Sequence, residues 1–225
     1  GLSAQHLEMV RRAIKKPYGI ILISGPTGSG KSTTLYSMLN EIDRETKNVL
    51  SLEDPVEFNI EGMSQSQVRP EINYTFATGL RTTLRQDPDI IMVGEIRDKE
   101  TAALAVQAAL TGHLVLSTIH TNNAVGVIPR LIDMGVDPYL IAPTLILAMA
   151  QRLVRTLCPN SGKLLPIEGS IKQFVEEKFA TLPDKFRGDL VPKGNLYGIL
   201  PSPECPNGTR GRMAVFEMFE MDREL

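Results

Sequence analysis

Uninterrupted apolar runs alternate with amphipathic segments along residues 1–157. The runs are short and rich in β-branched residues, which is typical of strands buried on both faces. These predicted strands are 18–24, 49–52, 90–93 and 114–119. The segments between and after them predict helices at 31–45, 76–85, 99–110, 124–134 and 138–156. Asp98 is the expected N-cap of the third helix, because its side chain can accept hydrogen bonds from the first turn.

Strands that alternate with helices at this spacing predict an α/β fold with a mostly parallel, twisted sheet. Residues 55–75 contain scattered Pro, Gly, Gln and Asn, which favours a long functional loop. The alternation stops after Cys158, and a charged helix around 170–179 stands among predicted loops. We therefore expect an α/β core over 1–157. Residues 158–225 should form a small appendage and the start of a C-terminal segment.

Composition narrows the class of protein. The chain has 225 residues, with 24 basic and 26 acidic side chains and a net charge of −2. It lacks the basic excess of a dedicated nucleic-acid-binding protein. No apolar run is long enough to span a membrane, and no signal peptide opens the chain. The first residue is not Met, so we expect a piece of a longer protein. The two cysteines cannot make a disulfide framework, which favours a reducing, cytosolic setting.

A glycine-rich motif follows the first predicted strand. The residues Gly25-Pro-Thr-Gly-Ser-Gly-Lys-Ser32 match the phosphate-binding P-loop, and a helix is predicted directly after them. The glycines let several backbone N–H groups face one anion, Lys31 reaches the β- and γ-phosphates, and the Ser32 hydroxyl binds Mg²⁺. The alternative is a glycine-rich turn with an exposed lysine. The residues expected to contact the nucleotide are Gly25, Pro26, Thr27, Gly28, Ser29, Gly30, Lys31, Ser32 and Thr33.

Acidic residues follow two other predicted strands. Many P-loop proteins end the strand corresponding to 90–93 with an Asp, but here Gly94 is followed by Glu95. A carboxylate there can orient a water molecule for in-line attack. The run containing Glu53, Asp54 and Glu57 lies at the end of the preceding strand and offers a substitute for the missing Asp. We expect Glu53 and Glu95 to support Mg²⁺, in part through water. Solvated acidic turns are the alternative.

Histidine and arginine side chains complete the candidate set. His120 lies at the carboxyl end of strand 114–119 and can sense the γ-phosphate or position Glu95, whereas His113 lies at the opposite end. Arg81 and Arg85 are four residues apart on one helix and could act as arginine fingers, in a neighbouring subunit's site if the protein oligomerises. Arg212 is a candidate late-chain phosphate sensor. The alternatives are a packed or capping histidine and a solvated basic helix face.

Four blocks of the sequence together resemble the secretion ATPase superfamily, which serves type II secretion and type IV pili. They match, in order, its Walker A motif, aspartate box, Walker B motif and histidine box. The blocks are Gly25–Ser32, Ser51–Glu57, Leu84–Asp98 and Thr111–Asn122. The resemblance implies a RecA-like P-loop ATPase core that is the C-terminal domain of a longer chain. It makes Glu95 the catalytic glutamate, Arg81 and Arg85 the arginine pair, and Arg212 a nucleotide-sensing arginine.

The resemblance also implies a setting for the protein. Members form hexameric rings that hydrolyse Mg-ATP on the cytoplasmic face of the inner membrane, peripheral to it. Their expected partners are a membrane platform protein, an adaptor and an upstream domain of the same chain that this sequence lacks. The segments Gln65–Val68, Met92–Ile96 and Ala150–Arg155 resemble the assembly branch rather than the retraction branch.

The cysteines depart from the family pattern. Many assembly-branch members bind a structural Zn²⁺ through two C-x₂-C pairs, but only Cys158 and Cys205 are present here. Tetrahedral structural zinc needs four thiolate or imidazole ligands, so no zinc is expected.

The leading hypothesis is a Mg-ATP-hydrolysing motor for assembly of a type IV pilus or a type II secretion pseudopilus. A catalytically silent nucleotide-binding scaffold is an alternative, but it requires a broken catalytic set, and Lys31, Ser32 and Glu95 are all present. A retraction motor and a DNA-handling RecA-like ATPase are further alternatives, since a fold does not fix a function. The net charge disfavours DNA handling, and no nucleic-acid partner is expected.

Overall fold

The computed structural model describes residues 1–159, 162–183, 191–192 and 194–221. The chain forms two compact units, one made of Gly1–Leu153 with Ala214–Leu225 and the other of Val154–Met213. From the sequence we expected the division after residue 157, followed by a small appendage and the start of a C-terminal segment. In the structure the chain leaves the first unit after Leu153 and rejoins it at Ala214.

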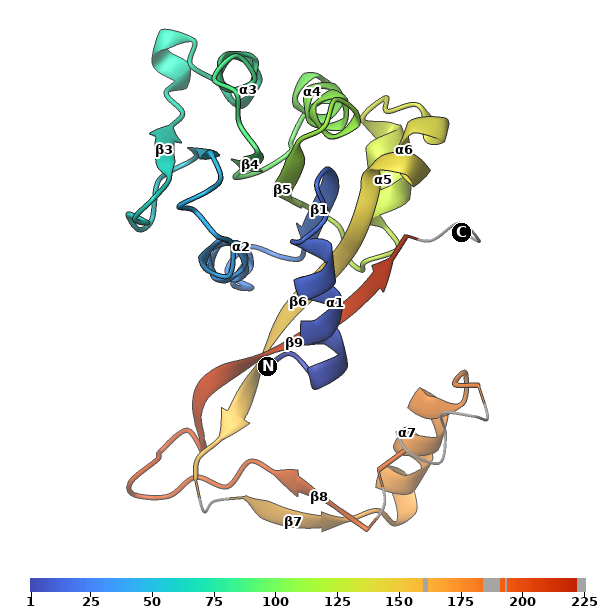
Figure 1. Ribbon diagram of the computed structural model, residues 1–225. Coiled ribbons are helices and arrows are strands. Elements are labelled where there is room, and N and C mark those ends of the chain that lie inside the picture. The colour runs from blue at the N-terminus through green and yellow to red at the C-terminus, as the bar shows by residue number, and fades with distance from the viewer. Residues whose placement is uncertain (160–161, 184–190, 193, 222–225) are drawn as a thin grey trace. The chain divides into compact units, whose positions relative to one another are not determined.

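The first unit is built on a sheet whose strand order is β3-β2-β4-β5-β1-β6-β9 (Figure 1). Neighbouring strands from β3 across to β6 are parallel, as predicted. Loops that follow these parallel strands therefore meet at one edge of the sheet, called here the carboxyl edge. The strands are β1 (Gly19–Ser24), β2 (Val49–Glu53), β3 (Ser64–Gln67), β4 (Ile90–Val93), β5 (Leu114–Ile119), β6 (Leu145–Leu157) and β9 (Thr209–Glu220).

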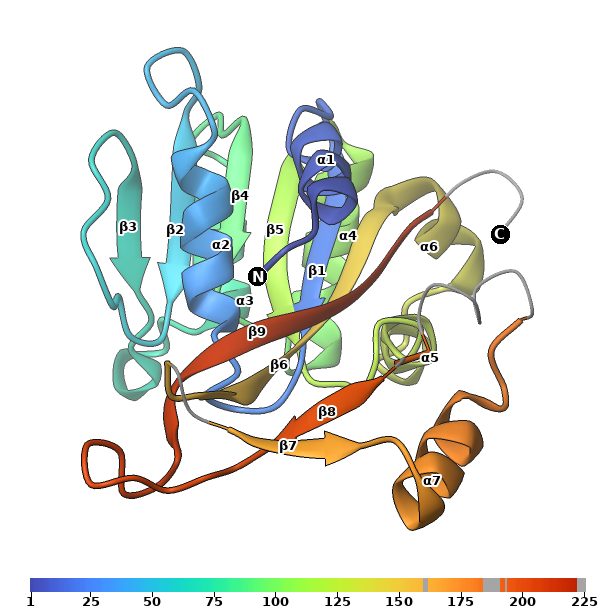
Figure 2. The same ribbon diagram turned by 90° about the horizontal axis from the view of Figure 1, so that it is seen from below.

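Helices cover both faces of the sheet. Helices α1 (Ala4–Ala13) and α2 (Lys31–Asn40) pack on one face, and Figure 2 shows them in front of the strands. The opposite face carries α3 (Phe76–Thr83), α4 (Lys99–Leu110), α5 (Val127–Asp133) and α6 (Pro138–Thr144). Side chains of β1 alternate between the two cores, with Ile20 and Leu22 on the α4 side and Ile21 and Ile23 on the α2 side. Burial on both faces explains why the strands are continuous apolar runs.

Several predicted elements are confirmed. Strands β4 and β5 and helix α4 have the predicted bounds, and the Asp98 side chain caps α4 by accepting a hydrogen bond from the Thr101 N–H at 2.8 Å. Helix α2 is shorter than expected and ends at Asn40. The predicted loop 55–75 contains β3 and the 3₁₀ helix η1 (Pro70–Ile72).

The predicted helix 138–156 was wrong from residue 145 onward. Helix α6 ends at Thr144, and the chain continues as β6, which pairs with β1. Leu147 and Met149 enter one core while Ala148 enters the other, as in a strand buried on both faces. An apolar run of this kind does not distinguish a buried strand from a buried helix.

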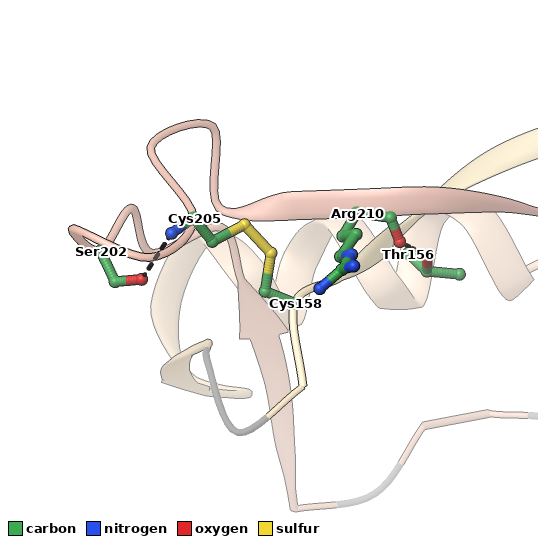
Figure 3. Close-up of a disulfide and its surroundings, with 5 residues drawn as sticks. All are labelled: Thr156, Cys158, Ser202, Cys205 and Arg210. Carbon is green, nitrogen blue, oxygen red and sulfur yellow. Dashed lines mark hydrogen bonds between the residues drawn. A yellow bond between two sulfur atoms is a disulfide. The ribbon is translucent and has the colours of Figure 1, made fainter.

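The second unit is small and contains an antiparallel pair and one described helix. Strand β7 (Lys163–Pro166) pairs with β8 (Asn195–Gly198), and α7 (Gly169–Phe179) confirms the predicted charged helix. A disulfide joins Cys158 to Cys205, with Cα atoms 6.7 Å apart, and the Cys205 N–H donates to Ser202 Oγ (Figure 3). The cysteine count led us to expect a reducing setting, whereas the structure pairs the two cysteines. No helix among the residues described in either unit is both long and apolar enough to cross a membrane.

Candidate active site

The P-loop connects the end of β1 to the start of α2, in the context that the motif requires. Gly25, Gly28 and Gly30 have φ values of 140°, 75° and 88°, which favour glycine. The Lys31 Nζ donates to the carbonyls of Gly25 at 2.9 Å and Pro26 at 3.1 Å, so the ammonium group lies inside the curve of the loop. Burial lowers the pKa of Lys31, and the nearby Glu95 carboxylate opposes that shift. An anion in the loop would compensate this poorly hydrated charge.

The loop fits a phosphate group and Mg²⁺. Gly30 is the N-cap of α2 and supplies no side-chain cap, so the N–H groups of the first helical turn remain available to an anion. The buried Ser29 Oγ has no hydrogen-bond partner among the described residues. Ser32 lies exposed in the first turn, where its hydroxyl can bind Mg²⁺.

A charged cluster lies at the neighbouring strand ends. Glu95 follows β4. Its carboxylate accepts a hydrogen bond from Arg97 Nε at 2.7 Å and lies 2.8 Å from His120 Nε2. The backbone around Glu95 is fixed to β5, because the Thr118 hydroxyl donates to the Gly94 carbonyl at 2.7 Å. Arg97 also lies 3.8 Å from the Asp54 carboxylate. The Glu95 side chain is 15% exposed, so it is accessible to water while held by two nitrogen groups.

Glu53 has a different environment at the end of β2. It is 3% exposed, and both carboxylate oxygens accept from the protein. Oε1 accepts from the Ser51 hydroxyl at 2.5 Å and from the Gln65 amide at 3.0 Å, and Oε2 accepts from the Tyr36 hydroxyl. The carboxylate oxygens that we expected to support Mg²⁺ therefore accept hydrogen bonds from protein groups instead. Asp54 and Glu57 are exposed, and the Glu57 N–H donates to Tyr36 Oη.

Tyr36 connects this buried cluster to helix α2. Burial, followed by the hydrogen bond to Glu53, raises the pKa of Tyr36 to about 12. The phenol therefore stays protonated at neutral pH and can donate to the carboxylate. Its ring also meets Phe58 edge to face at a centroid distance of 5.9 Å.

The two candidate arginine fingers lie on α3 and just beyond it. Arg81 forms an ion pair with Glu100 of α4, and both side chains are about half exposed. Arg85 is exposed beside Gln86, whose carbonyl accepts from Asn48 Nδ2 at 2.8 Å, immediately before β2 begins. Arg85 therefore lies at the edge opposite the P-loop, separated from it by the length of a strand, on the order of 15 Å. It is too far from the P-loop of its own chain to act there.

The remaining predicted residues are dispersed. His113 Nδ1 lies 2.9 Å from the Ala108 carbonyl near the end of α4, at the opposite end of β5 from His120. Arg212 is exposed on β9 within the second unit. No group of three or more His, Cys, Asp and Glu side chains that could hold a metal ion occurs in the described part of the chain.

Comparison with known proteins gives a consistent result. Residues 1–225 match the family described as "Type II/IV secretion system protein". The chain belongs to this family. It is 50% identical to "Type II secretion system ATPase E" of Vibrio cholerae over 226 residues, covering 100% of the chain and 43% of that protein. It is 48% identical to "Type IV pilus assembly ATPase PilB" of Myxococcus xanthus, covering 97% of the chain and 37% of that protein.

A solved structure supports the fold of this chain of the type II/IV secretion family. The structure described as "Crystal Structure of the Pilus Retraction Motor PilT and Bound ADP" aligns with a TM-score of 0.59 and 34% identity. The alignment covers 85% of the chain and 59% of that structure. The RecA-like P-loop fold predicted from the four motifs is thus confirmed. The chain spans less than half the length of the two curated relatives.

Within this family fold, the carboxyl edge brings together Lys31, Ser32, Glu95, His120 and Asp54 of the predicted site. Sequence reasoning missed Arg97, although its position two residues after Glu95 places it on the same loop. It also missed Gln151, whose side chain reaches the P-loop from β6. The incorrect helix prediction for 138–156 concealed that residue.

Proposed function

We propose that this chain is the catalytic part of a Mg-ATP-hydrolysing motor for assembly of a type IV pilus or a type II secretion pseudopilus. One observation carries the proposal: the P-loop lysine, Lys31, and the Glu95–His120 pair lie at the same edge of the sheet in a member of this family. The relatives named for type II secretion and pilus assembly share 50% and 48% of their aligned residues with the chain. The retraction motor shares 34%. Assembly is therefore favoured over retraction.

The P-loop residues supply the binding of ATP. The N–H groups of the first turn of α2 and the Lys31 ammonium hold the β- and γ-phosphates. Mg²⁺, when bound, would supply positive charge to the phosphate oxygens, and the Ser32 hydroxyl would hold it.

Glu95 is assigned to the attacking water. Its carboxylate can accept a hydrogen bond from that water and take up a proton as the water attacks. His120 and Arg97 hold the carboxylate from both oxygens, which fixes its orientation. Asp54 lies beside Arg97 and keeps that guanidinium from turning away. The role of Glu53 in this scheme is to support the edge of the sheet rather than to bind the metal.

Arg85 and Arg81 are assigned to a neighbouring subunit's site. Arg85 is too distant to reach the P-loop of its own chain, so any contact with phosphate would be made across a subunit interface. Both arginine side chains are exposed, which suits that role. We propose a homo-hexamer at the cytoplasmic face of the inner membrane, working with a platform protein and an adaptor.

The test is turnover of Mg-ATP by the full-length protein as a function of protein concentration. Specific activity should rise with concentration, fall strongly in Arg85→Ala, and vanish in Glu95→Gln. Activity that is independent of concentration and unaffected by Arg85→Ala would exclude action in trans. Tight Mg-ATP binding with no hydrolysis by the assembled wild-type protein would favour the silent scaffold.

A further inference from the structure

Gln151 is a buried polar residue that the catalytic scheme above does not use. It lies on β6, directly after the register pair of Ser24 with Ala150 that ends the contact between β1 and β6. Its side chain is 3% exposed. Because side chains alternate along a strand, Gln151 shares the α2 face with Leu147 and Met149.

The Gln151 amide joins two parts of the phosphate-binding segment. Its Nε2 donates to the Ser29 carbonyl at 2.8 Å, and its Oε1 accepts from the Thr34 hydroxyl at 2.8 Å. Thr34 is in the first turn of α2, and its hydroxyl also lies 3.2 Å from the Gly30 carbonyl. The Gln151 side chain from β6 therefore holds both the P-loop, at Ser29, and the first turn of α2, at Thr34.

The backbone of Gln151 also shapes the loop. A Cβ atom built on Gly25 would lie 2.3 Å from the Gln151 carbonyl oxygen, and one on Gly30 would lie 3.0 Å from Gln151 Nε2. Any larger residue at Gly25 would displace β6 or the loop. Gly25 is thus required by β6 as well as by its φ value, whereas Gly30 faces only the end of the Gln151 side chain.

We propose that Gln151 is a positioning residue for the phosphates of the nucleotide, an inference that rests on the proposed function. Consecutive N–H groups of the loop can face a phosphate only if the Ser29 carbonyl points away from that phosphate. The Gln151 Nε2 holds that carbonyl outward in a site from which water is largely excluded. Glutamine is suited to this position because its amide both donates and accepts. Glutamate would lack the donor and place a charge against a carbonyl.

This role predicts a selective defect. Loss of the amide leaves the buried Ser29 carbonyl unpaired and lets the loop adopt other conformations. The affinity for groups that the loop holds should fall, whereas the affinity for a ligand without phosphates should not change. The folded core should otherwise persist, because the hydrogen bonds of the amide in the described part of the chain are those with the Ser29 carbonyl and the Thr34 hydroxyl.

The experiment is calorimetric titration of the full-length protein with Mg-ATP, Mg-ADP and adenosine. In Gln151→Ala and Gln151→Glu, the affinities for Mg-ATP and Mg-ADP should fall about tenfold. Thr34→Val should lower them about threefold, and Thr34→Ser, which keeps the hydroxyl, should stay within about twofold of wild type. Gln107→Ala on the exposed side of α4 is the matched control and should leave the affinities unchanged.

Thermal unfolding without nucleotide separates positioning from simple structural support. A positioning residue changes the affinity of protein that remains fully folded. Wild-type affinity in Gln151→Ala, or a lower unfolding midpoint with unchanged affinity, would overturn the inference. If the Gln151 variants do not fold, Thr34→Val tests the inference instead. Unchanged nucleotide affinity in that variant would show that the hydrogen bond between Thr34 and Gln151 does not position the loop, and it would overturn the inference. Failure of the wild-type protein to bind Mg-ATP would instead refute the proposed function itself.

Discussion

Glu53 and Glu95 stand at the same edge of the sheet, on neighbouring strands, and have opposite surroundings. The Glu53 carboxylate is buried and accepts from a phenol, a hydroxyl and an amide, which are all neutral donors. The Glu95 carboxylate is partly exposed and faces an imidazole and a guanidinium. A carboxylate enclosed by neutral donors fixes the structure around it, whereas one that is open to solvent can contact a water molecule.

The largest expected effect is on turnover at Glu95. Glu95→Gln keeps the size of the side chain but removes its capacity to take up a proton. The turnover number of the full-length protein should fall about 10³-fold, while the Mg-ATP affinity and the unfolding midpoint change little. Steady-state hydrolysis and calorimetric binding measure these quantities. A variant that loses binding together with turnover would show that Glu95 supports the site rather than the water.

The next effect is on stability at Glu53. Glu53→Ala leaves the Tyr36 hydroxyl, the Ser51 hydroxyl and the Gln65 amide without their shared acceptor. The free energy of unfolding should fall by about 3 kcal/mol, measured by denaturant titration. The exposed Glu57→Ala is the control and should change it by less than about 0.5 kcal/mol. A stable Glu53→Ala protein with abolished turnover would reverse the comparison and return Glu53 to the metal site.

A smaller effect is expected at Arg97. Arg97→Ala frees one oxygen of Glu95 and leaves His120 as its remaining partner in the charged cluster. Turnover should fall about fivefold, because the hydrogen bond to a charged group is lost but the carboxylate that we propose to act on the water remains. Hydrolysis at constant ionic strength measures it, and Arg69→Ala on the exposed surface is the control. A loss as large as that in Glu95→Gln would give Arg97 a direct role at the phosphates.

The smallest expected effect is that of Tyr36 on the free energy of unfolding at alkaline pH. Its pKa is raised to about 12 from the ordinary value of 10.0. Between these two pH values the folded state keeps the Tyr36 hydroxyl proton, whereas the unfolded state has released it. The associated stability is fully present below pH 10 and is lost as pH rises towards 12. Tyr36→Phe should cost about 1 kcal/mol near neutral pH and remove this alkaline loss. Unfolding at several pH values measures both, and an unchanged pH dependence would contradict the burial argument.

Features set by local pattern could be predicted from the sequence. The apolar strands β4 and β5, the N-cap at Asp98 and the P-loop each depend on a few adjacent residues. Features set by distant partners could not. Strand β3 reads Ser-Gln-Ser-Gln and has no apolar pattern, since it lies at the sheet edge and pairs only with β2.

The different environments of Glu53 and Glu95 could not be predicted from the sequence either. The sequence indicates that Glu53 and Glu95 follow buried strands, which is the same signal for both. Their surroundings depend on Tyr36 from α2 and Gln65 from β3 in one case, and on His120 after β5 in the other. These residues meet only when the strand order is known. The contact of Gln151 with Ser29 likewise required the correct assignment of β6 as a strand.

The second unit begins after Leu153 on β6 and ends at Met213 on β9, and these strands are neighbours in the sheet. In topological terms, the second unit is an insertion between two adjacent strands. Residues can be gained or lost between them without a change in the register of β1, β4 or β5, because those pairings involve no residue of the insertion. The second unit can therefore change in length or sequence while the carboxyl edge that carries the P-loop keeps its strand pairings.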